Sequence, residues 1–238
     1  MVTIDGEEIV SGSTIDGDEI SVITMDGDVV WNALPDAPFL QPQENDLSHF
    51  EDTGSYRIEN SPTITEDYVL TNDSRNTYTY SVSGLDHYPK IGDKWEFYWK
   101  EEYTSGSGGH LGMHFAVQED DPSKNYFAGH APTDNDEIIA KDTGPIYSDD
   151  VIIESTSQSI SNGDWYLCEI TWAENGDIRV REYNVNQSTG ERRDKIVELV
   201  TNDSTYSDGG IGFSREDTST EPARQGFRII ERGISSID

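Results

Sequence analysis

The chain has 238 residues, and its 47 Asp and Glu residues against 16 Lys and Arg give a formal net charge of −31. A charge of this size excludes nucleic acid and anionic membrane surfaces as partners, and the sequence has no apolar stretch long enough for membrane insertion. Hydrophobic residues make up 33% of the chain, so the 5 Trp and 12 Tyr residues must supply much of any folded core.

The acidic residues are spread along the whole sequence and are not concentrated in one tail. In dilute buffer such a charge repels itself and penalises the compact state. At molar salt the screening length falls to about 3 Å, and most of this repulsion disappears. The composition is similar to that of proteins from halophiles, and it predicts a protein that is folded in a high-salt environment and loosens in ordinary buffer.

Residues 1–31 contain three copies of a short unit, at 3–9, 14–20 and 24–31, each with an Asp-Gly pair flanked by apolar residues. Asp-Gly tolerates the positive φ angles of a two-residue hairpin turn, so each unit predicts a small hairpin. The spacing does not match an EF-hand calcium loop. A ribbon this small cannot bury its own apolar face, so it must pack on the main domain, on copies of itself, or on a larger assembly.

The segment at 15–31 is similar to the N-terminal segments of many structural proteins from tailed viruses, where such segments precede a binding or decoration domain. This resemblance implies that residues 1–31 contact other virion proteins. Residues 32–45 carry three prolines, which interrupt strands and helices. They are therefore interpreted as a linker to a main domain at 46–238.

The main domain shows no helical periodicity but many short strand-like stretches between turns rich in Asn, Asp, Gly and Ser. Strands are expected at residues 67–71, 77–83, 94–103, 111–118, 125–130, 151–155, 164–172, 177–185, 196–200, 210–215 and 226–230. This pattern favours an antiparallel sandwich or barrel.

The clearest unit is a hairpin that turns at Asn175-Gly176. Alternation places Cys168, the one cysteine of the chain, on an apolar strand face, where it is expected to be a buried small side chain. Glu169 and either Arg181 or Arg179 fall on polar faces, where cross-strand pairs are expected.

The pattern of Gly, Trp, Tyr and Ile at 163–180 resembles the concanavalin A-like jelly roll of legume lectins, laminin G-like domains and laminarinase-type glucanases. Residues 209–213 near the end of the domain support this resemblance, and residues 226–230 are similar to its closing strand. The resemblance covers 46–232 and implies an all-β, antiparallel jelly-roll sandwich, preceded here by the N-terminal β-ribbon.

Catalysis is not expected. Glucanases of this fold carry Glu-x-Asp-x-x-Glu on one strand, whereas Glu96 is followed by Tyr98 and Glu169 by Thr171 at the Asp position. The histidines lack zinc-protease spacing, and there is no Gly-x-Ser-x-Gly elbow.

Sugar recognition needs aromatic faces beside hydrogen-bonding groups. The candidate glycan-binding residues lie on the strand at 94–103 and in loops at the sheet rim: Trp99, Tyr103, His110, Tyr126, His130 and Asp134. For Trp99 the alternative is packing in the core beside Trp95 and Phe97.

Asp149 and Asp150 are candidate Ca²⁺ ligands, since acidic loops hold Ca²⁺ in several lectins of this fold. The alternative for these loops is a solvated acidic surface of a salt-adapted protein.

Together these features predict a virion structural protein of a tailed virus that infects a halophilic archaeon. It would be a homo-oligomeric, outward-facing decoration, fibre or receptor-binding module that contacts glycans on the host surface. Two alternatives stay open: a cell-surface or secreted haloarchaeal carbohydrate-binding protein, and a capsid cement protein without a ligand.

Overall fold

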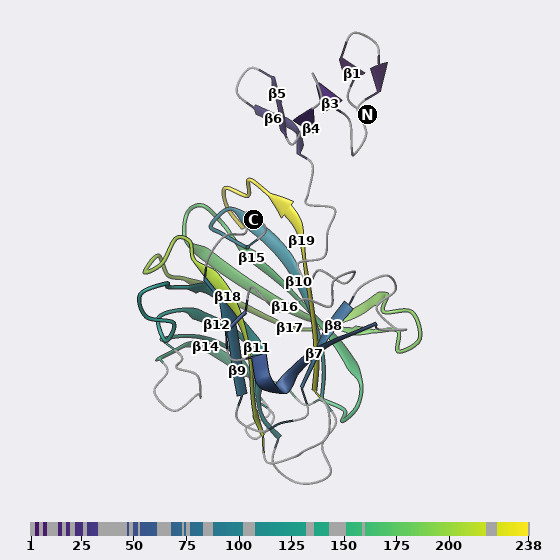
Figure 1. Ribbon diagram of the computed structural model, residues 1–238, viewed down its shortest axis with the longest axis vertical. Coiled ribbons are helices and arrows are strands. Elements are labelled where there is room, and N and C mark those ends of the chain that lie inside the picture. The colour runs from purple at the N-terminus through teal and green to yellow at the C-terminus, as the bar shows by residue number, and fades with distance from the viewer. Residues whose placement is uncertain are drawn as a thin grey trace.

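The structure is a computed structural model of the full chain (Figure 1). It describes the backbone of six short strands within 3–32. Beyond these it describes residues 47, 50–51, 53–60, 68–72, 74, 77–82, 88–101, 108–131, 136–142, 151–158, 160–217 and 223–237. In this part of the chain there is no helix with the length and hydropathy of a membrane span.

Two antiparallel sheets form the main body, and this confirms the predicted all-β jelly-roll sandwich (Figure 1). The seven-stranded sheet has the order β17 (Arg192–Asn202), β16 (Asp177–Val185), β15 (Trp165–Trp172), β10 (Asp93–Glu101), β19 (Ala223–Arg232), β8 (Tyr68–Asn72) and β7 (Tyr56–Asn60). The six-stranded sheet has the order β14 (Val151–Ser157), β13 (Asp136–Lys141), β12 (Tyr126–Ala131), β11 (Gly108–Val117), β18 (Gly210–Asp217) and β9 (Thr77–Ser81). A single turn of 3₁₀-helix, η1 (Thr53–Ser55), precedes β7.

Aromatic side chains fill the space between the two sheets. On β10 the alternate residues Trp95, Phe97 and Trp99 are all completely buried. Phe115 of β11 packs edge-on against Trp95, with ring centroids 5.1 Å apart. Large rings bury more apolar surface per residue than aliphatic side chains do, so a chain with few hydrophobic residues can still build a continuous core.

The predicted hairpin around Asn175 is present, and its register settles the cross-strand partners. Ile170 lies opposite Val180, and Glu169 lies opposite Arg181. Gly176 has φ +86°, the left-handed conformation that glycine adopts at little cost at the end of such a turn. Cys168 is fully buried, as expected from the alternation.

The sequence analysis missed two strands, β7 and β13. Both are short, and β13 reads Asp-Glu-Ile-Ile-Ala-Lys, in which the acidic start was assigned to a rim loop. The sheet environment decides such segments more than their own propensity does.

The N-terminal segment contains three hairpins, each forming its own two-stranded sheet. They pair β1 (Thr3–Ile4) with β2 (Glu7–Glu8), β3 (Thr14–Ile15) with β4 (Asp18–Glu19), and β5 (Val22–Met25) with β6 (Asp28–Asn32). In each pair one Asp-Gly dipeptide separates the strands, which confirms the predicted hairpins. The division into 1–31, 32–45 and 46–238 stays a prediction.

Candidate functional site

One candidate site lies at the rim of the sandwich, where the 118–125 and 203–209 segments meet the end of β13. Its centre is Tyr206, a partly exposed ring that packs edge-on against Tyr126 with centroids 5.2 Å apart. The Tyr206 hydroxyl donates to the Asp142 carboxylate, and Lys124 Nζ lies 3.5 Å from Asp142 Oδ1. Asp203 and Lys141 complete the group. These five residues are called the rim site below: Tyr206, Asp142, Asp203, Lys141 and Lys124. Tyr126 lies beneath them.

Asp203 ties the rim site to the core. Its carboxylate accepts hydrogen bonds from the Tyr126 hydroxyl at 2.6 Å and from Lys141 Nζ at 2.6 Å. It also accepts the Thr205 N–H at 2.8 Å, which makes an Asx-turn within the loop. Burial opposes ionisation of Asp203, but the bonds from Lys141, Thr205 and Tyr126 outweigh it and hold the pKa of this carboxyl well below its usual range.

The local backbone conformation positions Asp142, the second carboxylate of the rim site. Asp142 follows β13 directly and has φ +55°, a left-handed conformation that Asp tolerates better than most residues do. Its N–H donates to the Asn125 carbonyl at 3.0 Å. Burial and the bond to Asp142 raise the pKa of Tyr206, so its hydroxyl stays protonated and continues to donate. The rim site thus combines a partly exposed aromatic ring with two hydrogen-bonded carboxylates and two ammonium groups.

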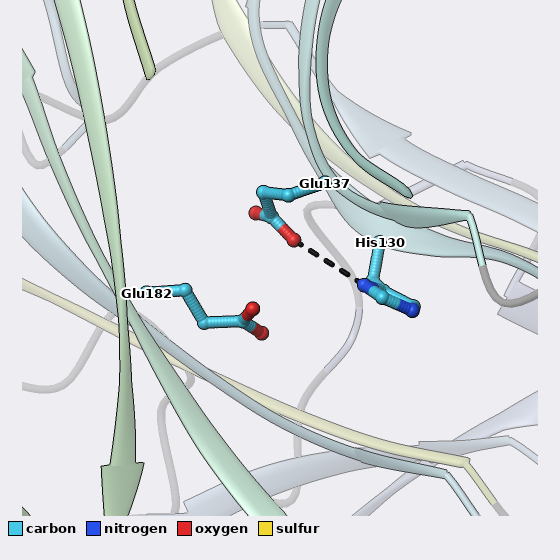
Figure 2. Close-up of side chains that lie close together, drawn as sticks. All are labelled: His130, Glu137 and Glu182. Atoms are coloured by element: carbon cyan, nitrogen blue, oxygen red, sulfur yellow. Dashed lines mark ion pairs between the residues drawn. The ribbon is translucent and has the colours of Figure 1, made fainter. Parts of the chain in front are cut away.

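A second cluster lies between the two sheets (Figure 2). His130 and Glu137 are directly opposite each other on β12 and β13 of the six-stranded sheet. Glu182 reaches them from β16 of the seven-stranded sheet, and all three side chains are completely buried. One ligand atom of each lies within 4.8 Å of the others. This trio is called the core cluster below.

Most polar atoms of the core cluster have no hydrogen-bond partner among the described residues. The atoms without a hydrogen bond are both oxygens of Glu182, Oε2 of Glu137 and both ring nitrogens of His130. Glu137 Oε1 is the exception, because it accepts the Cys168 thiol at 3.4 Å. Burial first, and the Glu137 carboxylate second, raise the pKa of Glu182 well above its usual range.

The outer face of the seven-stranded sheet carries a third polar group. Glu169, almost fully buried, lies 3.1 Å from Lys94 Nζ and 2.7 Å from Arg192 Nη1. Arg181 Nη1 lies 3.7 Å from the same carboxylate, so of the two predicted partners of Glu169, Arg181 and Arg179, the structure selects Arg181. Arg192 also covers the Tyr183 ring at 4.8 Å from its centroid. Three cations around one carboxylate indicate a structural role for Glu169.

Two predicted glycan contacts are corrected by the structure. Trp99 and His130 have no exposed surface and stack on each other inside the sandwich, with centroids 5.5 Å apart. A ring enclosed in the core offers no face to a sugar, so the core-packing alternative for Trp99 is the right one. Tyr126 does lie at the rim site, but its ring is buried and only its hydroxyl reaches the polar groups.

The remaining predicted residues cannot be placed in a site. His110 belongs to strand β11, and its side chain lies outside the described part of the structure. Tyr103, Asp134, Asp149 and Asp150 also lie outside the described residues.

Sequence reasoning missed most members of both clusters. One signal was present for Glu182, because it follows Ile178 and Val180 at alternate positions of the same strand and so had to point inward. Tyr206 and Asp142 carried no such signal, since both lie just outside regular strands.

No family model matches the sequence, and no curated protein gives a significant match. Several solved structures are similar to the sandwich at low identity. The carbohydrate binding module CBM66 from Bacillus subtilis is 12% identical, with 76% of this chain and 92% of that chain covered and a TM-score of 0.46. Galectin LEC-6 from Caenorhabditis elegans is 7% identical, with 78% and 99% covered and a TM-score of 0.36. Arcelin-5, a lectin-like defense protein from Phaseolus vulgaris, is 9% identical, with 77% and 91% covered and a TM-score of 0.39.

Proposed function

We propose that the sandwich is a non-catalytic carbohydrate-binding module whose glycan site is the rim site. The observation that carries this proposal is the partly exposed Tyr206 ring, whose hydroxyl donates to Asp142 and which packs on Tyr126, the tyrosine that bonds Asp203. A pyranose packs its CH face on an aromatic ring, while its hydroxyl groups bond to carboxylates and ammonium groups at the ring edge. Lys141 and Lys124 supply the donors, and Asp142 and Asp203 the acceptors.

The biological setting of the proposal is the virion of a tailed virus of halophilic archaea. The formal net charge of −31 suits a high-salt exterior. The three N-terminal hairpins, each too small to be stable alone, suit an anchor on other virion proteins. The outward-facing sandwich would bind host surface glycans, and a homo-oligomer would convert weak contacts into avidity.

Two other settings use the same fold and stay as competing proposals. A haloarchaeal cell-surface or secreted protein would keep the glycan site without virion partners. A capsid cement protein would have the sandwich without any sugar binding. Asp149 and Asp150 remain proposed Ca²⁺ ligands, and glycan binding that is lost on adding EGTA would support that part.

The test is binding of the full-length protein, in molar KCl, to haloarchaeal cells with and without periodate oxidation of their surface glycans. We expect saturable binding that oxidation removes. Replacing Tyr206→Ala removes the ring, which contributes about 1.5 kcal/mol, and should weaken binding about tenfold. Tyr206→Phe keeps the ring and loses only the bond to Asp142, so it is the matched control and should stay within about threefold.

Equal binding by both variants and the native chain would place the sugar elsewhere and contradict the rim site. Binding that survives oxidation would contradict carbohydrate recognition altogether. Sedimentation velocity in molar KCl tests the multivalent display, which requires an oligomer. A monomer at all concentrations would refute it.

A further inference from the structure

The core cluster has a geometry that the glycan site does not use. We propose that His130, Glu137 and Glu182 bind one divalent transition-metal cation between the two sheets. Such a centre is independent of the rim site and links the sheets through coordination bonds. Figure 2 shows the three side chains pointing into one space from strands of both sheets.

The strand registers position the three ligands, two on one sheet and one on the other. His130 and Glu137 are direct partners in the β12–β13 ladder, and His130 Nδ1 already lies 3.5 Å from Glu137 Oε2. Two ligands bound tetrahedrally at about 2.0–2.1 Å from a zinc ion are about 3.3 Å apart. On the other sheet, Glu182 is the direct partner of Cys168 in the β15–β16 ladder. The three ligand atoms all lie within 4.8 Å of one another, and rotation about the side-chain bonds of Glu182 brings its carboxylate closer to the other two.

The orphaned polar atoms point to a ligand. Buried carboxylates are paired, hydrogen-bonded or metal-bound, because an isolated buried charge is strongly unfavourable. Both Glu182 oxygens and Glu137 Oε2 are completely buried and accept no hydrogen bond of ordinary geometry among the described residues. Trp99 lies near enough to Glu182 to oppose in part the rise in its pKa that burial causes, and His130 Nδ1 lies 3.5 Å from Glu137 Oε2. Two carboxylates, a neutral imidazole and a dication sum to zero charge. A cation therefore satisfies all three side chains at once.

The surroundings support the same assignment. The Cys168 thiol donates to Glu137 Oε1, which orients that carboxylate and leaves Oε2 for the metal. The Trp99 ring lies nearly parallel to the imidazole of His130, at an angle of 20°, and fixes its plane. An imidazole ligand favours zinc and its neighbours in the first transition row, whereas Ca²⁺ takes oxygen ligands.

The experiment uses the full-length protein in molar KCl after treatment with EDTA and removal of the chelator. Zn²⁺ and Co²⁺ are added in turn, with excess Mg²⁺ to occupy surface carboxylates. We expect one equivalent of Zn²⁺ bound per chain by elemental analysis, a rise in Tm on adding Zn²⁺, and the visible d–d absorption of low-symmetry Co²⁺.

Glu182→Gln and His130→Gln should each weaken Zn²⁺ binding at least tenfold. His114→Gln is the matched control, since His114 is also buried in the six-stranded sheet but is bonded to Asn125 and Ser214. It should leave the Zn²⁺ stoichiometry unchanged.

Three outcomes would overturn the proposal. The first is a native protein that is folded but binds no stoichiometric metal and keeps its Tm in EDTA. The second is Zn²⁺ binding that is unchanged in Glu182→Gln and His130→Gln, which would assign the metal to surface acids. The third is a native chain whose Tm does not respond to Zn²⁺ together with a Glu182→Gln variant of higher Tm, which would show that Glu182 is buried as a protonated acid. If a variant does not fold, the native stoichiometry and the Co²⁺ spectrum decide alone.

Discussion

Replacing Asp203→Asn tests how the rim site is held to the sandwich. Asn keeps one carbonyl oxygen, which still accepts the bonds from the Tyr126 hydroxyl and the Thr205 N–H. Its amide nitrogen, however, faces Lys141 Nζ, so the 2.6 Å ion pair is replaced by two opposed donors. The side chains of Lys141 and Asp203 are 23% and 13% exposed, which makes this pair stronger than a surface pair.

We expect a loss of about 2 kcal/mol in the free energy of unfolding at pH 7, in the range for a charge-assisted hydrogen bond. For a chain of this size, that corresponds to a fall in Tm of about 4–8 °C. The assay is thermal unfolding in molar KCl, followed by circular dichroism. Asp208→Asn, an exposed aspartate in the same loop, is the control and should change Tm by less than about 2 °C.

The pH dependence gives a second check with a definite sign. Because the pKa of Asp203 is lowered in the folded state, its stabilisation is complete above the unfolded pKa of about 3.9. It is lost progressively as the pH falls below that value toward the folded pKa. The Tm difference between the native chain and Asp203→Asn should therefore be largest at pH 7 and should decrease as the pH falls below 4. The reasoning would be refuted if the two proteins differed by less than about 0.5 kcal/mol in the free energy of unfolding at pH 7. It would also be refuted if their Tm difference stayed constant as the pH fell below 4.

Three other outcomes follow from packing and charge. Gly129→Ala should cost about 1–3 kcal/mol in denaturant unfolding, because its Cβ would lie 2.4 Å from the Leu111 carbonyl oxygen. Gly54→Ala, with nothing within 4 Å of its Cβ, is the control, and equal stability of the two variants would contradict the close packing. The fully buried Cys168, whose thiol pKa burial raises well above its usual value, should react with maleimide only after unfolding. Labelling of the folded chain, detected by mass spectrometry, would count against it. Finally, the far-UV dichroism of the sandwich should diminish between molar and millimolar KCl, and an unchanged spectrum would rule out salt dependence.

The sequence by itself determined the local structure. The Asp-Gly pairs at the N-terminus and Asn175-Gly176 in the main domain specify turns, since their backbone preferences depend on two or three neighbouring residues. Alternation in 165–172 specified which side chains share a face, and it left Arg179 and Arg181 as the possible partners of Glu169, of which the strand register selects Arg181. Both kinds of information are local, so they were read from the sequence with little error.

The tertiary structure alone decided which strands meet. β10 lies between β15 and β19, and β12 faces β16 across the core, although these strands are far apart in the sequence. Alternation predicts faces but not which face is covered, so Trp99 was left open between a glycan contact and the core, and His130 was assigned to a rim loop, although both belong to the interior. The core cluster and the rim site both join residues from different strands and loops. Their chemistry exists only after the two sheets pack, because packing removes water from Glu182 and brings Tyr206 to Asp142.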